Sequence, residues 1–225
     1  MSVSLRKASG DDLDIVAAAK VSTGLDLEVH DPARVPGLIN YLMKSRHGSP
    51  FEHVTFTFRV SAPIFVFREF QRHRIASYNE ESGRYKKLEP KFYLYPEDRP
   101  MVQSGSGAHP KLTMGTPTLT KLINGETRAQ CISAWRSYER QLGYGAANEV
   151  ARAVLPFDIF SSMYVTMNAR ALMNFLSLRV DDEDALFVSK PQWEIDSVAR
   201  QLEDHFKAQL PHTHAAFVKN RRVAP

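Results

Sequence analysis

The strongest constraint on the fold is a stretch of strict alternation, HVTFTFRV, at residues 53–60. Its apolar members share one side, at the two-residue period of a half-buried strand: Val54, Phe56, Phe58 and Val60. The segment IFSSMYVTMN at 159–168 also has the residue types of a strand. Because helical patterns surround these strands, the sequence predicts the α+β class.

Helical periodicity covers most of the remaining sequence. Helices are predicted at 11–22, 31–47, 127–142, 145–156, 169–180 and 192–210, and another begins at Ser61 and carries Arg72, His73 and Arg74 at its C-terminal end. Segment 101–125 is rich in Gly, Ser, Thr and Pro, which predicts a flexible surface insertion. We therefore predict a single α+β domain over 1–225, with a mixed or antiparallel sheet packed by helices.

Composition limits the classes of function. Lys and Arg number 29 against 25 Asp and Glu, and this formal net charge of +4 fits an anionic small ligand as well as nucleic acid. The one cysteine, Cys131, excludes an internal disulfide, and its apolar helical surroundings predict a buried, unreactive thiol. Without a signal peptide or an apolar run of membrane length, the expected location is the cytoplasm, with no membrane partner.

The histidines at 212–214 are weighed as metal ligands. No further ligands stand near them at metal-like spacing, so the sequence predicts a loop there and no metal site. The following tail at 219–225 is expected to be solvated.

The segment QRHRIASYNEESGRY, at 71–85, mixes many charges with residues that favour turns. If NEESGR is extended, Glu80, Ser82 and Arg84 fall on one side, and Gly83 allows a close backbone approach. A guanidinium, a hydroxyl and backbone N–H groups suit a phosphate, while a carboxylate accepts donors from a sugar or a base. This set of groups matches a nucleotide.

Arginines also recur among apolar residues. Arg152, Arg170 and Arg179 lie in ARAVLP and NARALMNFLSLR, and a buried guanidinium needs a paired anion that the neighbouring sequence does not supply. On a helix each residue turns by about 100°, so Arg72 and Arg74 would point to nearly opposite sides. We expect those two to serve different groups or different subunits.

Two other interpretations of the 71–85 segment remain open. It can be a solvated loop crossed by ion pairs. Alternatively, the chain is a nucleic-acid-binding module that uses a phosphate stripe and two stacking rings: Arg72, His73, Arg74, Arg84, Lys86, Lys87 and Lys91, with Tyr78 and Tyr85. The module explains the charges but not Arg152 and Arg179. A yellow, flavin-containing protein would favour an enzyme, and steeply salt-dependent oligonucleotide binding would favour the module.

The stretch RHRIASYNEESGR resembles the signature of flavin-dependent thymidylate synthases. The resemblance extends upstream through RHGSPFEH and APIFVFREFQ, and downstream through ARAVLP, NARALMNFLSLR and QWEI, in the family's order. It implies a homotetramer with sites built between subunits, each holding FAD and dUMP. It also implies the conversion of dUMP to dTMP, with methylenetetrahydrofolate as one-carbon donor and NADPH as the reductant of FAD.

The resemblance further implies roles for individual residues. The expected FAD contacts are Ser49, Arg72, His73, Arg74, Glu80, Asn168, Ala169, Arg170 and Asn174. The expected dUMP contacts are Glu69, Phe70, Gln71, Arg72, Glu80, Glu81, Ser82, Gly83, Arg84, Arg152 and Arg179. Glu69 stands where some members carry glutamine.

Two residues are expected to be catalytic, Arg179 from the dUMP contacts and His47, which belongs to neither set of contacts. Arg179 would hold the uracil imide and favour the ionised ring. His47 matches a histidine near the flavin that affects turnover. Ser82 is interpreted as a phosphate ligand, because no histidine is placed beside it as a base.

Overall fold

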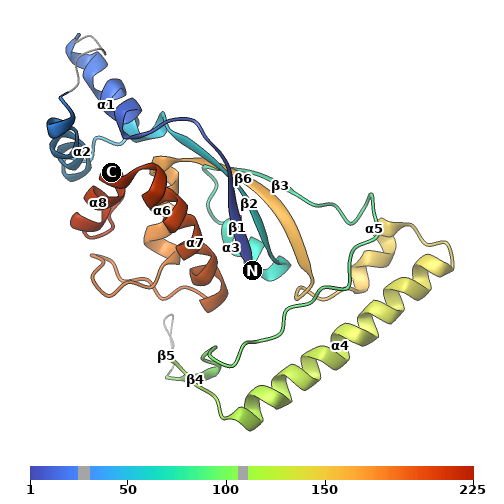
Figure 1. Ribbon diagram of the computed structural model, residues 1–225. Coiled ribbons are helices and arrows are strands. Elements are labelled where there is room, and N and C mark those ends of the chain that lie inside the picture. The colour runs from blue at the N-terminus through green and yellow to red at the C-terminus, as the bar shows by residue number, and fades with distance from the viewer. Residues whose placement is uncertain (25–30, 106–110) are drawn as a thin grey trace. The chain divides into compact units, whose positions relative to one another are not determined.

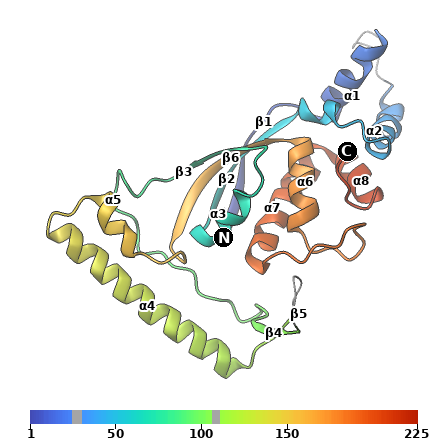
Figure 2. The ribbon, with the colours of Figure 1, turned by 180° about the vertical axis from the view of Figure 1, so that it is seen from behind.

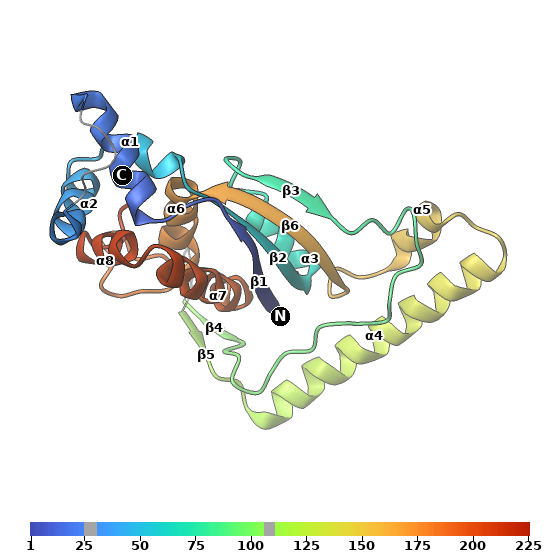
Figure 3. The ribbon, with the colours of Figure 1, turned by 45° about the horizontal axis from the view of Figure 1, so that its top comes forward.

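The computed structural model describes residues 1–24, 31–105 and 111–225. A four-stranded antiparallel sheet has the order β1-β2-β6-β3 (Figure 3). Its strands are β1 (Ser2–Ala8), β2 (Thr55–Pro63), β6 (Phe160–Asn168) and β3 (Ser77–Glu80). The predicted α+β class with an antiparallel sheet is confirmed, and the two strands predicted from the sequence are present.

The alternation at 53–60 buries one face of β2. Its four apolar side chains are each 0% exposed. Helix α7 (Trp193–Gln209) packs on this face, where Phe206 lies edge-on to Phe56 with ring centroids 6.0 Å apart. Helix α6 (Ala169–Arg179) packs beside α7 (Figure 1). The predicted helices at 169–180 and 192–210 are therefore confirmed to within a few residues.

Three shorter helices pack together: α1 (Asp12–Lys20), α2 (Val35–Lys44) and α8 (Pro211–Lys219). Asp12 is buried and caps α8, since its carboxylate accepts from the His212 N–H at 2.8 Å and the Thr213 N–H at 3.0 Å. The predicted loop at 212–214 is wrong because this cap comes from a residue about 200 positions earlier. The prediction of a solvated tail is also wrong at Arg222, which is 6% exposed.

Helix α4 (Pro117–Gly143) is one uninterrupted helix of 27 residues (Figure 2). It follows an antiparallel pair, β4 (Val102–Ser104) and β5 (Lys111–Thr113). The segment predicted to be a flexible surface insertion, 101–125, thus contains two short strands and the start of α4, and its residues 106–110 lie outside the described residues. Thr116 caps α4 by accepting from Leu119 N–H at 3.2 Å, with Pro117 in the first turn. Threonine and proline here start a helix, whereas the sequence pattern was typical of a turn.

The helix predicted from Ser61 begins later. Ser61 pairs with Ser2 in the sheet, so β2 continues to Pro63, and α3 covers only Ile64–Phe70. Arg72, His73 and Arg74 therefore lie beyond the helix end. Arg72 and Arg74 therefore do not project from opposite sides of one helix, and that prediction is wrong.

Two further local predictions need correction. Strand β3 ends at Glu80, and Tyr85 N–H donates to Ser82 O at 3.3 Å in a turn, so the expected alternation through Arg84 does not hold. The helix predicted at 145–156 is reduced to α5 (Asn148–Ala151) and a 3-10 turn, η4 (Arg152–Val154).

The chain divides into two compact units. One contains 1–61, 69–79 and 163–225, and the other contains 62–68 and 80–162. Strands β2 and β6 each continue from one unit into the other along the chain. No helix in the described ranges has the length and apolar character needed to cross a membrane.

Candidate active site

The predicted site residues fall into two groups, one in each unit. The 62–68 and 80–162 unit holds Glu80, Glu81, Ser82, Gly83, Arg84 and Arg152. The other unit holds His47, Ser49, Glu69, Phe70, Gln71, Arg72, His73, Arg74, Asn168, Ala169, Arg170, Asn174 and Arg179.

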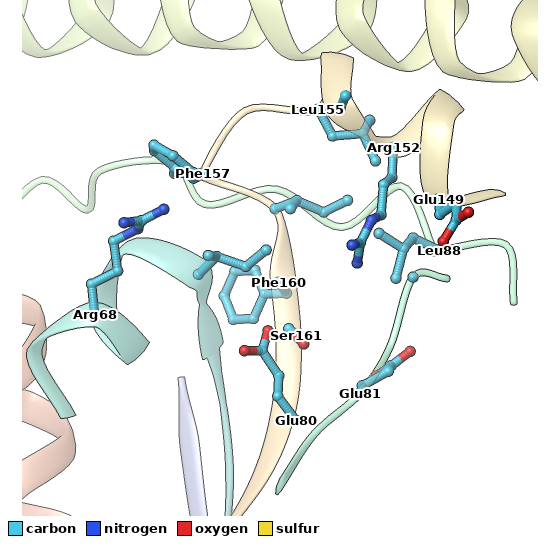
Figure 4. A pocket seen from close by; sticks show the side chains of 14 residues that line it. Arg68, Glu80, Glu81, Leu88, Glu149, Arg152, Leu155, Phe157, Phe160 and Ser161 are labelled. Carbon is cyan, nitrogen blue, oxygen red and sulfur yellow. The ribbon is translucent and has the colours of Figure 1, made fainter. Parts of the chain in front are cut away.

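A cavity of about 500 Å³ lies in the 62–68 and 80–162 unit (Figure 4). Its charged lining comes from three places: Arg68 on α3, Glu80 and Glu81 at the end of β3, and Glu149 and Arg152 on the α5–η4 segment. The apolar side chains of Phe157 and Phe160 complete the wall. A cavity of this size, with a few convergent polar groups, is typical of a small-molecule site.

Glu80 points into the cavity (Figure 4). Burial raises the pKa of its carboxyl, and the neighbouring Glu81 charge acts in the same direction. The Ser161 hydroxyl and the Arg152 guanidinium oppose this rise. The carboxyl is therefore sensitive to any cation or donor that enters the cavity.

Gly83 makes room for Arg152. A Cβ atom at Gly83 would lie 3.0 Å from Leu88 Cδ1 and 3.3 Å from Arg152 Cδ, so a larger residue would push against both. Arg152 is exposed, and among the described residues no carboxylate forms an ion pair with it. The expectation that Arg152 is a buried guanidinium is wrong, since it is an available cation at the rim of the cavity.

Arg84 is held by an exposed ion pair. Its Nε donates to Glu149 Oε2 at 2.9 Å, and both side chains are about half exposed. Such pairs are worth about 0 to 1 kcal/mol, so a bound phosphate can replace Glu149 at low cost. Ser82 Oγ accepts from Arg84 N–H at 3.2 Å, which keeps the hydroxyl close to the same turn.

Arg179 and His73 meet in the other unit, although the resemblance places them on different ligands. Arg179 Nη1 lies 2.7 Å from Glu69 Oε2, and its Nε donates to His73 Nε2 at 3.1 Å. Burial, and next the Arg179 charge, lower the pKa of His73 to about 4. His73 is therefore neutral at pH 7, and its Nε2 is an acceptor.

Tyr78 fixes the turn that follows α3. Its hydroxyl lies 2.8 Å from both Phe70 O and His73 O, and burial raises the pKa of Tyr78 to about 12. The sequence predicts Tyr78 only as a ring that stacks on a base, and this contact of its hydroxyl is not foreseen. A tyrosine a few residues after an arginine-rich turn does not, from the sequence alone, predict that its hydroxyl bonds to the backbone of that turn.

Arg170 is paired with a distant acid. It bonds Glu52 through Nη1 at 2.6 Å and donates from Nε to Pro225 O at 2.6 Å. A Cβ atom at Gly48 would lie 2.5 Å from the Arg170 guanidinium, so glycine allows this contact. Gly48 separates His47 from Ser49, both of which are exposed.

The remaining predicted residues differ in how accessible they are. Asn168 caps α6 by accepting from Ala171 N–H at 2.8 Å. The exposed residues are Gln71, Arg72, Arg74 and Asn174. The side chains of Phe70 and Ala169 are fully buried, so they serve packing.

The cavity and the arginine groups together define a class of protein. An α+β fold with cations at the rim of a cavity, a carboxylate inside it and a glycine-lined turn is suited to binding a nucleotide.

Comparisons with known proteins give the family. The family model described as Thymidylate synthase complementing protein matches residues 4–212. The chain is 51% identical over 228 residues to a flavin-dependent thymidylate synthase from Tropheryma whipplei, covering 100% of this chain and 95% of that protein. A flavin-dependent thymidylate synthase from Streptomyces coelicolor is 49% identical over 230 residues, covering 100% and 94%.

A solved structure agrees with these matches. The UMP/dUMP methylase PolB from Streptomyces cacaoi, in its crystal structure with 5-Br dUMP, matches with a TM-score of 0.95 and 44% identity. The match covers 100% of this chain and 97% of that chain. The chain belongs to the flavin-dependent thymidylate synthase family, as the RHRIASYNEESGR resemblance predicts.

Proposed function

We propose that this chain is a flavin-dependent thymidylate synthase that converts dUMP to dTMP. Methylenetetrahydrofolate is the one-carbon donor, and FAD reduced by NADPH is the hydride source. Family membership supports this reaction class. The structural observation that carries the proposal is the cavity in which Glu80, Gly83 and Arg152 converge.

The cavity fits dUMP by the chemistry of its groups. Arg152, Arg84 and Ser82 supply the guanidinium and hydroxyl groups that bind a phosphate. Gly83 leaves room for Leu88 and Arg152 beside the turn, and Glu80 accepts hydrogen bonds from a sugar or a base. PolB, a relative of similar fold, is described as bound with a dUMP analogue, which supports this assignment.

The other group fits a flavin cofactor by its donor set. Arg72 and Arg74 are exposed, and no described carboxylate pairs with either, so both are available to a diphosphate. His73 is neutral and can hydrogen-bond a ring system. Ser49, Asn168, Arg170 and Asn174 complete the proposed FAD contacts, whereas the expected contact at Ala169 is not proposed again, because this residue is fully buried. When bound, FAD supplies the hydride, and the protein binds and orients the reactants.

Arg179 is proposed to hold the uracil edge. Its side chain is 17% exposed and its guanidinium already donates to Glu69 and His73, so its orientation is set before a ligand arrives. A uracil carbonyl would compete with Glu69 for the same fork. Stabilising negative charge on the ring makes the pyrimidine more reactive. His47 is the second proposed catalytic residue.

The assembly and location are also proposals. We expect a homotetramer whose sites are shared between subunits, with residues 1–225 acting as one functional domain in the cytoplasm. The partners are dUMP, folate and NADPH, without nucleic acid, membrane or metal. Within the described ranges no cluster of His, Cys, Asp or Glu is arranged to hold a metal ion.

The proposal is tested by spectroscopy and binding. The purified protein should show flavin absorbance and bind dUMP in calorimetry, and Arg152→Ala should weaken dUMP binding without removing the flavin. Lys121→Ala, an exposed change on α4, is the matched control. A colourless protein that does not bind dUMP but binds oligonucleotides with a steep salt dependence would overturn the proposal.

A further inference from the structure

Ser161 on β6 has a buried hydroxyl group and is not among the residues proposed to contact dUMP or FAD. The residue is 5% exposed and lies in the wall of the cavity. Within the described part of the chain its Oγ has no hydrogen-bond partner. A buried polar group without a settled partner is costly, which calls for an explanation.

The sheet register brings Ser161 to Glu80. The Glu81 N–H donates to Ser162 O at 2.8 Å, which pairs the neighbouring strands β3 and β6 at that point. Glu80 and Ser161 each precede one member of this pair, so their side chains leave the same face as diagonal neighbours. Figure 4 shows the Ser161 side chain beside the Glu80 carboxylate.

We propose that Ser161 is a positioning residue that aims the Glu80 carboxylate into the cavity as a hydrogen-bond acceptor. This inference rests on the proposed function, because it assigns the acceptor to a nucleotide bound there. In this proposal the hydroxyl, which has no hydrogen-bond partner among the described residues, rotates in solution to donate to Glu80 and restricts its rotamers. A ligand hydroxyl or N–H then meets an oriented carboxylate.

The charges around Glu80 show why the hydroxyl matters. Burial raises the pKa of Glu80, and the Glu81 charge adds to this, while Ser161 and Arg152 lower the pKa. Arg68 and Glu149, from α3 and α5, are the other charged groups that line the cavity. Without Ser161 the opposing influence falls mainly to Arg152. A protonated Glu80 would donate where the ligand needs an acceptor.

The first test measures Glu80 directly, without any ligand. Carboxyl ¹³C NMR should follow the titration of Glu80 in the wild type and in Ser161→Ala, Ser161→Cys and Ser161→Thr. We expect the titration midpoint to rise in the Ala variant and in the equal-sized Cys variant, and to stay at the wild-type value in the Thr variant. The matched control is Thr166→Val, which removes a half-buried hydroxyl from the same strand.

The second test measures dUMP affinity against pH. Ser161→Ala should bind dUMP about three- to tenfold more weakly at pH 7. As the pH is lowered, its dUMP affinity should begin to fall at a higher pH than that of the wild type. Equal Glu80 titration in Ser161→Ala and the wild type would overturn the inference. Wild-type protein that does not bind dUMP would instead refute the proposed function, and the ligand-free titration would still decide the role of Ser161.

Discussion

At the residue scale, Arg179 depends on partners that are distant in the sequence. Glu69 and His73, its two partners, lie 110 and 106 residues earlier in the chain. The expectation that an arginine in an apolar helix stripe needs an anion is therefore met at Arg179 by Glu69. The sequence shows the need for a partner, but pairs at this separation follow only from the fold.

Replacing Arg179 tests its role. Arg179→Ala should lower dTMP formation at saturating dUMP by roughly a hundredfold to a thousandfold, since a lost charge-assisted contact in a transition state is worth on the order of 2 to 4 kcal/mol. The rate of dTMP formation by Arg179→Lys should lie between those of the wild type and Arg179→Ala, because the compact charge of lysine cannot replace the planar guanidinium of arginine. The assay is accompanied by flavin content and by the rate of flavin reduction with NADPH.

Arg200→Ala is the control, because it removes a half-exposed arginine that is not among the proposed site residues. Near-wild-type dTMP formation by Arg179→Ala would remove Arg179 from the mechanism. Loss of flavin from that variant would make its role structural.

At the element scale, helices and strands with clear local periodicity were predictable. The alternation in β2 and the apolar stripes of α6 and α7 indicate which face of each element is buried. The starts of α4 and α8 were not predictable from pattern alone. Thr116 and Pro117 also suit a turn, and the cap of α8 is the side chain of Asp12 on another helix.

A buried ion cluster fastens the chain after α8 to α7. Arg222 bonds Glu203 through two parallel contacts of 2.8 Å, and His214 on α8 lies 2.9 Å from the same carboxylate. Burial raises the pKa of Glu203, but the bonds from His214 and Arg222 outweigh it and lower this pKa to about 2. Arg222 has a left-handed backbone conformation, with φ of 58°.

Breaking this cluster should destabilise the fold in a pH-dependent way. Arg222→Leu leaves the Glu203 charge buried without its main partner, and we expect a loss of about 3 kcal/mol at pH 7. Because the folded pKa of Glu203 is depressed, the stabilisation is present above about 4.5 and is lost as the pH falls towards about 2. Urea unfolding from pH 7 to pH 2 should show the two proteins converging at the acid end.

Arg200→Leu is the matched control, with an expected change within about 1 kcal/mol, because the Arg200 side chain in its ion pair with Asp196 is half exposed. Equal stability of Arg222→Leu and the wild type at pH 7 would show that the cluster contributes little to stability.

At the scale of the whole molecule, the proposed site residues are divided between two units. The motif RHRIASYNEESGR itself crosses from one unit to the other at Glu80. The sequence predicts the set of residues but not which unit each belongs to. Between Arg84 and Arg179 no sequence pattern marks the boundary between the two units.

Assembly is the first prediction at this scale. Sedimentation should show a homotetramer, because each subunit alone is expected to supply only part of a site. Dilution that dissociates the tetramer should reduce flavin content and turnover together. A stable monomer that binds FAD and forms dTMP would contradict the shared-site proposal.

The most direct measurement is dTMP formation by the purified protein from dUMP, methylenetetrahydrofolate and NADPH, with each component omitted in turn. We predict that product formation needs all three substrates and the bound flavin. We also predict that Cys131→Ala keeps the activity, because Cys131 is buried in α4 and only 4% exposed. Product formed without flavin or NADPH, or complete loss of turnover in a folded, flavin-containing Cys131→Ala protein, would contradict flavin-dependent thymidylate synthesis by this chain.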